Sequence, residues 1–148
     1  MEIKEVKRNK KQYLSLLLLA DEQENMVDRY LERGTMYVLD DKGIKAECVV
    51  TDEGNGILEI KNIATDPDSQ RRGYGKALID FISSKYQGKY SVLQAGTGDS
   101  PLTVPFYEKC GFSRSHVVEN FFTDNYDHPI YEAGIQLKDM VYLRKKLV

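Results

Sequence analysis

The sequence predicts a single α/β domain built on a mixed, mostly antiparallel sheet, and three observations support this. The chain has 148 residues, which is the length of one domain. Three strand-like segments between positions 35 and 65 are separated only by turn residues, which indicates an antiparallel meander. A helical pattern over 73–86 then stands between two strand patterns, and a crossover of this kind gives local parallel pairing.

The N-terminal part is expected to begin with an edge strand at residues 3–6. Residues 10–20 carry a dense set of apolar side chains and predict a helix. A second helix is expected over 21–33, because acidic residues stand at its start and Gly34 is suited to end it.

The three strands of the meander are expected at 35–39, 44–51 and 57–65. Gly43 can take up a positive φ in the first turn, and Asn55-Gly56 is a strong signal for the second.

After the helix at 73–86, the sequence predicts a strand at 90–95 and a helix at 101–110. Pro101 stands near the start of that second helix, and Gly111 ends it. Two late strands are expected at 114–122 and 140–147, on either side of a polar stretch at 123–138. The result is a sheet of about seven strands with about four helices.

Composition limits the functional class. A net charge of −2 with 41% apolar and 30% charged residues is ordinary for a folded soluble protein and does not predict a nucleic-acid partner. The longest apolar run is too short for a membrane span, and a cytoplasmic location is expected. Cys48 and Cys110 are expected to be reduced thiols, and neither has a metal-ligand spacing to His116 or His128, so no metal is expected.

The most informative stretch joins the strand at 57–65 to the helix at 73–86. A strand-to-helix loop exposes unpaired N–H groups at the positive end of the helix dipole, where phosphates bind. Glycines let the backbone approach the ligand, and three basic side chains add positive charge. The residues of this loop are Gln70, Arg71, Arg72, Gly73, Tyr74, Gly75, Lys76 and Ala77.

Three phosphate motifs compete for this loop. A P-loop fails at Gln70 and Ala77, and a dinucleotide fingerprint fails at Leu78. The pattern [Q/R]xxGx[G/A] is matched in full by Gln70, Gly73 and Gly75. On the loop alone, a phosphate site and a basic surface loop with glycines serving only the turn remain equal alternatives.

Further motifs resemble the GNAT family of acetyl-CoA-dependent N-acetyltransferases. The segment Val104-Pro105-Phe106-Tyr107-Glu108-Lys109-Cys110-Gly111-Phe112 is similar to the family's motif after the fifth strand. The segment Ile60-Lys61-Asn62-Ile63-Ala64-Thr65-Asp66-Pro67 resembles its fourth strand and the turn into the glycine loop. The resemblance covers about a third of the chain by motif and nearly all of it by element order, and it implies the GNAT fold.

The resemblance also implies a set of site residues. The pyrophosphate of coenzyme A is expected on the loop from Gln70 to Ala77, and the acetyl oxygen near the backbone of Ile63 or Ala64. Thr65, Ser100 and Lys109 are further expected contacts. The family often has an Asn after the fifth strand; this chain has none, and Thr97 or Ser100 is the expected substitute.

Two residues are expected to carry the acid and base chemistry. By resemblance, Tyr107 is the acid that protonates the leaving thiolate, since a phenol keeps its proton at neutral pH. Glu59, on the strand before the loop, is the leading base, with a solvated strand residue as the alternative and His116 as another candidate base. Strand alternation places Glu59, Lys61 and Ile63 on one face, opposite Leu58, Ile60 and Asn62. A covalent step through Cys110 is rejected because no ordering His or acid stands near it.

The acceptor is expected to be a primary amine, attacked directly in a ternary complex. Acidic residues before Met26 and around Tyr126 and Tyr131 would favour a small cationic amine, with solvated loop carboxylates as the alternative; these residues are Asp21, Glu22, Glu24, Asp124, Asp127, Glu132 and Asp139. The alternatives are a non-catalytic acyl-CoA sensor, a protein-interaction module and an enzyme acting on protein N-termini or lysines. A homodimer formed through the late strands is an expectation by analogy.

Overall fold

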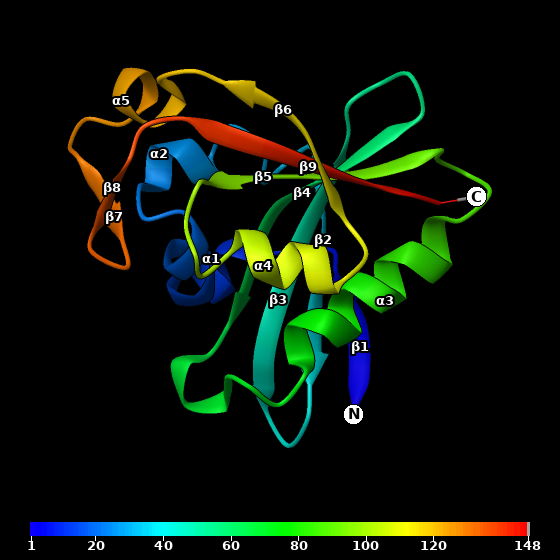
Figure 1. Ribbon diagram of the computed structural model, residues 1–148. Coiled ribbons are helices and arrows are strands. Elements are labelled where there is room, and N and C mark those ends of the chain that lie inside the picture. Colours follow the sequence, from blue (N-terminus) through cyan, green and yellow to red (C-terminus); the bar gives the residue numbers. More distant parts are fainter. Residues whose placement is uncertain (148) are drawn as a thin grey trace.

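The computed structural model describes residues 1–147, which form a seven-stranded sheet of order β1-β2-β3-β4-β5-β9-β6 (Figure 1). All neighbouring pairs are antiparallel except β4 and β5, which are parallel as the crossover predicted. The strands of this sheet are β1 (Glu2–Val6), β2 (Thr35–Asp40), β3 (Ile44–Asp52), β4 (Ile57–Thr65), β5 (Val92–Gly98), β6 (Ser113–Val118) and β9 (Met140–Lys146).

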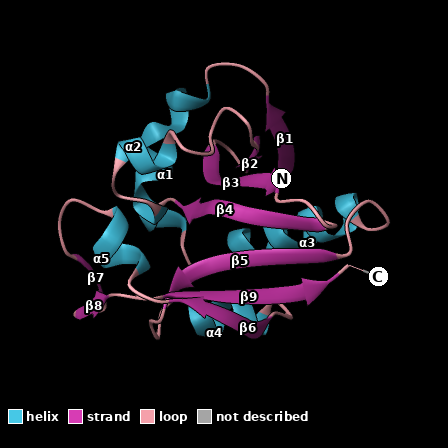
Figure 2. Ribbon diagram, turned by 90° about the horizontal axis from the view of Figure 1, so that it is seen from above, coloured by secondary structure: helices cyan, strands magenta, loops and turns pink. Residues whose placement is uncertain are grey.

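Helices cover both faces of the sheet. One face carries α3 (Tyr74–Tyr86) and α4 (Val104–Lys109), and the other carries α1 (Leu14–Ala20) and α2 (Glu24–Val27). Figure 2 shows the strands edge to edge, with α1 and α2 toward the β1 end of the sheet and α4 beneath β9 and β6. The expected α/β architecture is therefore confirmed.

Two apolar cores hold these layers together. The larger core lies between the sheet and α3, whose Leu78, Ile79 and Ile82 have no exposed surface. The smaller core lies under α1 and α2, around Leu17 and Val27. Full burial of each such side chain stabilises the fold by about 1.5–3 kcal/mol, so both helical layers are firmly attached.

The sheet divides between β4 and β5. The two strands pair only from Ile57 to Ile60, although β4 continues to Thr65 and pairs with β3 along that whole length. On its other side, β5 pairs with β9 along its whole length. The edge of β4 that faces β5 is therefore left without a strand partner after Ile60, and we call this opening the fork.

The expected assignment of β4 side chains to the two faces of the sheet was wrong beyond Ile60, because a β-bulge lies at Lys61. Ile60 pairs with Val50 but Asn62 pairs with Val49, so Lys61 is an extra residue. Because one inserted residue reverses the alternation, Asn62 lies on the α1 face, where its side-chain amide donates to the Leu17 carbonyl. Glu59 shares that face, whereas Ile63 packs in the α3 core.

The predicted late strand at 114–122 and polar stretch at 123–138 were partly wrong. β6 ends at Val118, because Asn120 takes a left-handed conformation and starts a short helix, α5 (Phe121–Asn125). The polar stretch contains a hairpin, β7 (Ile130–Glu132) and β8 (Ile135–Leu137). Its turn residues, Ala133 and Gly134, both have positive φ, as a two-residue hairpin turn requires.

Smaller corrections concern the helix boundaries. The expected helix at 10–20 begins with a 3₁₀ turn (Lys10–Tyr13), and the expected helix at 21–33 is regular only in α2 before it continues as turns. The expected fifth strand begins later and ends at Gly98. No helix within residues 1–147 is long and apolar enough to cross a membrane.

Candidate active site

The turn at Gly73 lies where the free edge of β4 leads into α3. A 3₁₀ turn (Pro67–Ser69) follows β4, and its start is fixed by the Asp66 side chain, which accepts from the Asp68 N–H at 2.9 Å. Gly73 then caps α3 with φ at +83°, a conformation that disfavours any other residue. A Cβ at Gly73 would meet nothing within 4 Å, so space is open above this turn.

The N-terminus of α3 presents unpaired donors at this open space. The N–H of Ala77 is the first to bond within the helix, to the Gly73 carbonyl at 2.9 Å. The N–H groups of Tyr74, Gly75 and Lys76 precede it in the first turn and have no intrahelical partner. Such a helix start attracts anions.

Gly75 brings this helix start close to α4. A Cβ at Gly75 would come within 3.1 Å of Phe106 Cζ and 3.9 Å of Thr65 Oγ1. Any larger residue would push α3 away from α4 and from the end of β4. Glycine is therefore needed at the two motif positions for different reasons. Gly73 needs it for its positive φ, and Gly75 needs it for the close packing against α4.

The side chains of the loop differ in what they can contact. Gln70, Arg71 and Arg72 are exposed beside the turn. Tyr74 is buried instead, and its hydroxyl donates to Asp41 at 2.6 Å. Lys76 lies along α3 and pairs with Asp80 at 2.7 Å.

On the far side of the fork, hydroxyl groups fix the loop between β5 and α4. Thr97 donates to Thr103 at 2.8 Å. The buried Ser100 hydroxyl accepts the Leu102 N–H at 3.0 Å. Lys109 is exposed at the end of α4. Both candidates for the missing Asn are thus engaged in holding this loop.

Tyr107 extends from α4 and is 6% exposed. Burial is the main cause that raises the pKa of its phenol, and the thiols of Cys48 and Cys110 add to the rise. The carboxyl of Glu47, on the opposite face of the sheet, acts on the pKa of Tyr107 in the same direction. The phenol therefore keeps its proton throughout the neutral range.

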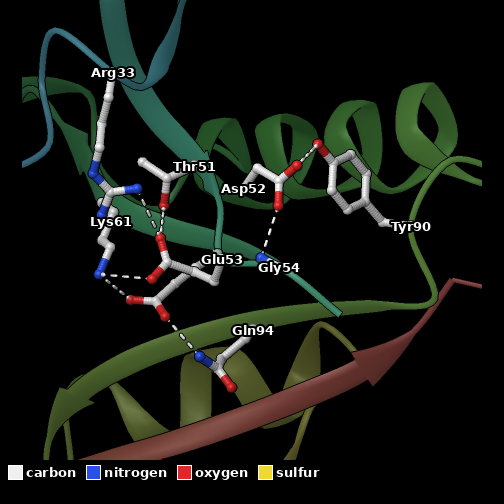
Figure 3. Close-up of polar contacts among 9 residues, drawn as sticks. Arg33, Thr51, Asp52, Glu53, Gly54, Lys61, Tyr90 and Gln94 are labelled. Carbon is white, nitrogen blue, oxygen red and sulfur yellow. Dashed lines mark hydrogen bonds and ion pairs between the residues drawn. The ribbon is translucent and has the colours of Figure 1, made fainter. Parts of the chain in front are cut away.

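Glu59 belongs to a chain of polar contacts across the α1 face, and Figure 3 labels its partners Lys61 and Gln94. Its carboxylate pairs with Lys61 at 2.9 Å and accepts from the Gln94 amide at 2.6 Å. Gln94 in turn accepts from Arg144 Nε at 2.8 Å. Glu59 is only 5% exposed, so these partners compensate for its loss of water.

The same chain continues to the end of β3 (Figure 3). Glu53 accepts from Thr51 at 2.6 Å and from Arg33 at 3.0 Å. Partial burial raises the pKa of Glu53, but the hydrogen bonds outweigh it and the net pKa is lowered. His116, the other candidate base, is exposed and stacks on Tyr142 at 4.7 Å between ring centroids.

Contacts between the α1–α2 loop and the segment after α5 close one end of this face. Asp21 accepts from the hydroxyls of Tyr30 at 2.9 Å and Tyr126 at 2.6 Å. His128 bridges Asp127 at 2.5 Å and Glu22 at 3.1 Å. We call these contacts the latch. Sequence reasoning noted the acidic residues but not their partners, because the two segments are about a hundred residues apart.

A cavity of about 360 Å³ opens beside α1 on this face. It lies between that helix and the turns at the ends of β3 and β4. Its lining includes Tyr13, Leu16, Ile44 and Asp66. In the part of the chain that the structure describes, no group of three His, Cys, Asp or Glu side chains is arranged to hold a metal ion.

The fork, the Gly73 turn and the element order together match known acetyltransferases. The profile of the acetyltransferase (GNAT) domain matches residues 32–114, more than half of the chain. The N-acetyltransferase YvbK of Bacillus subtilis is 37% identical over 131 residues, which cover 86% of this chain and 84% of YvbK. The chain belongs to the GNAT family.

Two solved GNAT-type structures are closely similar. A GNAT family acetyltransferase from Elizabethkingia anophelis with acetyl-CoA bound has a TM-score of 0.92 and 34% identity, covering 98% of this chain and 97% of that one. A Bacillus subtilis acetyltransferase in complex with CoA has a TM-score of 0.89 and 34% identity, covering 99% of both chains. The GNAT fold and the acetyltransferase class expected from the motifs are therefore confirmed.

Proposed function

We propose that this protein transfers the acetyl group of acetyl-CoA to a primary amine by direct attack in a ternary complex. The observation that carries the proposal is the continuity between the fork and the Gly73 turn. Together they offer an unpaired strand edge about 15 Å long, at roughly 3.3 Å per residue, that ends at an anion site. This is the shape of a thioester on an extended arm with a pyrophosphate at its end.

The cofactor would bind through backbone groups. The pyrophosphate lies on the N–H groups of Arg72, Gly73, Gly75 and Lys76, with the exposed Arg71 and Gln70 beside it. The arm follows the free edge of β4 past Thr65, and Ser100 and Lys109 flank it. Tyr74 and Ala77 support the helix start from behind, since the Tyr74 side chain and the Ala77 N–H have partners of their own.

The acetyl group would reach the bulge on β4. There the thioester oxygen accepts from the backbone N–H of Ile63 or Ala64, and the same bond strengthens as the oxygen becomes negative during attack. Because the donor is fixed in the strand, it costs little reorganisation. After the bulge at Lys61, this stretch of backbone stays paired with β3 on one edge and leaves its other edge open to the fork.

Two proton transfers complete the reaction. An aliphatic ammonium, with a pKa of about 10.4, must give one proton to a base before it attacks, and Glu59 is the proposed base, directly or through a water. After the C–N bond forms, the C–S bond breaks. The thiolate takes a proton from Tyr107, which is restored by the second proton of the attacking nitrogen. One proton is released to solvent overall.

The acceptor is proposed to be a small cationic amine, because the latch places Asp21, Glu22 and Asp127 at the end of the face where it would enter. A panel of amines with acetyl-CoA, followed by thiol release, tests the proposal, alongside calorimetry of acetyl-CoA alone. Release with one class of amine is expected. Binding of acetyl-CoA without release from a broad panel would favour a non-catalytic sensor, and no binding would remove the proposal.

A further inference from the structure

One buried carboxyl group is not accounted for by the reaction described so far. Glu47 on β3 has no exposed surface, and neither of its carboxyl oxygens has a hydrogen-bond partner within residues 1–147. The Oδ1 atom of Asn62 on β4 is also buried without a partner. A buried polar atom without a partner destabilises a fold, so three such atoms on neighbouring strands require an explanation.

Glu47 and Asn62 both lie on the α1 face of the sheet, on adjacent strands. Glu47 pairs in register with Ala64, and Val49 pairs with Asn62, so Glu47 and Asn62 are diagonal neighbours on adjacent strands. The Asn62 amide group is turned away, because it donates to Leu17 and to the Tyr30 hydroxyl, both at 3.0 Å. Its oxygen is thereby fixed as an acceptor.

The cavity beside α1 lies on the same face of the sheet as Glu47 and Asn62. Its lining residue Ile44 packs in the core under α1, on the face and strand of Glu47. Its lining residue Asp66 follows two positions after Ala64, the partner of Glu47. The cavity is therefore lined by residues close in the strands to Glu47, although Glu47 and Asn62 do not line it themselves.

The geometry points to a buried site in which Glu47 and Asn62 hold a primary ammonium group of the acceptor. When Glu47 is ionised, its two carboxylate oxygens and Oδ1 of Asn62 are three acceptors, and these match the three N–H donors of such a group. A water has only two donors and cannot satisfy all three. The inference rests on the proposed function in that it assigns the bound group to the acceptor.

The charge of this site determines the role of the bound nitrogen. An ammonium ion paired with a buried carboxylate holds its proton more tightly, which is the opposite of what a nucleophile needs. The nitrogen at Glu47 is therefore an anchor, and a second amino group attacks at the fork. Since adjacent strands are about 4.8 Å apart, the acceptor is a short diamine with its nitrogens roughly 5–7 Å apart.

Binding at the anchor can be measured without any acetyl transfer. We would compare the thermal midpoint in methylammonium chloride and in tetramethylammonium chloride at pH 8, since the second ion has no N–H donors. Methylammonium is expected to raise the midpoint by about 3 °C more than its control at saturating concentration. Glu47→Gln should remove the difference. The same substitution at the exposed Glu5 of β1 should leave it intact.

Two outcomes of this experiment would overturn the inference: equal midpoints in the two salts, or the same difference in Glu47→Gln. If that variant does not fold, the inference is tested by how the salt difference in the wild-type thermal midpoint depends on pH. Burial raises the pKa of Glu47, so the difference between the salts should be present above that raised pKa and lost as the pH falls through it. The charge of Glu47 contributes to raising the pKa values of Tyr30, Tyr107 and Cys48. These raised pKa values keep all three groups neutral over this range.

Kinetics would then separate this inference from the proposed function. With 1,4-diaminobutane and butylamine as acceptors, kcat/KM should favour the diamine at least tenfold in the wild type and become equal in Glu47→Gln. Transfer to both amines without this preference would remove the anchor and leave the acetyltransferase proposal standing. Thiol release with neither amine, together with an intact salt difference, would leave an ammonium site at Glu47 standing but remove its assignment to the acceptor.

Discussion

Glu59 and Glu47 are buried carboxyl groups on neighbouring strands and the same face, yet their surroundings are opposite. Glu59 has an ion pair with Lys61 and a hydrogen bond from Gln94. Glu47 has no partner within the described residues, and burial alone raises its pKa. A partnered carboxylate is stable without a ligand, whereas an unpartnered one indicates where a ligand with donors would bind.

The position of the fork explains this difference. β4 pairs with β5 only as far as Ile60, and the polar chain of Figure 3 lies beside that paired part of the sheet. Glu47 lies next to the part of β4 that has left β5. Polar cross-strand side chains are available to Glu59, whereas the cross-strand neighbours of Glu47, Val38 and Ala64, are apolar, and a ligand can supply the donors that Glu47 lacks.

The largest effect, a fall in kcat, is expected for substitution of Tyr107, across the fork. Tyr107→Phe should lower kcat by about 100-fold, because a positioned general acid contributes roughly 10²–10⁴-fold. Acetyl-CoA affinity should change little. Tyr86→Phe is the matched control, since its hydroxyl is bonded to Tyr37 at 2.7 Å at the far end of α3. Equal turnover in wild type and Tyr107→Phe would exclude this residue from the mechanism.

Substitution of the two glutamates should change the free energy of unfolding by different amounts. Glu59→Gln should cost about 1–2 kcal/mol, because it leaves the partly buried Lys61 ammonium without its main partner. Glu47→Gln should be close to neutral at pH 7, since it replaces a carboxyl that already resists ionisation. Urea unfolding of both variants measures this. A larger loss for Glu47→Gln would mean that an ion pair holds this carboxylate in solution.

The smallest effect is expected at the latch. Hydrogen bonds to Asp127 and then to Glu22 raise the pKa of His128. A raised folded-state pKa means that these contacts stabilise fully below about pH 6.5 and are lost as the pH rises through the raised value. The thermal midpoint of wild type should therefore exceed that of His128→Gln at pH 6 and converge with it at higher pH. A gap that is constant with pH would contradict the protonated bridge.

Much of this molecule could be predicted from sequence, because local signals specify it. The Asn55-Gly56 turn, the glycines at 73 and 75 and the helix at 73–86 each depend on neighbouring residues, and they define the meander, the loop and the family. The hairpin turn at Ala133 was missed because alanine is not a usual residue for positive φ.

The details of the site depend on distant contacts and could not be predicted in the same way. The bulge at Lys61 reverses the face of Asn62, and no local pattern marks it. Glu47 stands in a strand as an ordinary charged residue would, and only the packing of α1 over β3 and β4 shows that it is buried. The partners of Asp21 are likewise brought together by the fold.

The central claim is that acetyl-CoA places its pyrophosphate at the Gly73 turn. Calorimetry of acetyl-CoA with wild type, Gly73→Glu and Gly88→Glu tests it most directly. Gly88 is the matched control, because it has φ at +85° and equally open space. Tight binding is expected in wild type and Gly88→Glu, and a loss of about 100-fold or more in Gly73→Glu. Undiminished binding by a folded Gly73→Glu would contradict the account.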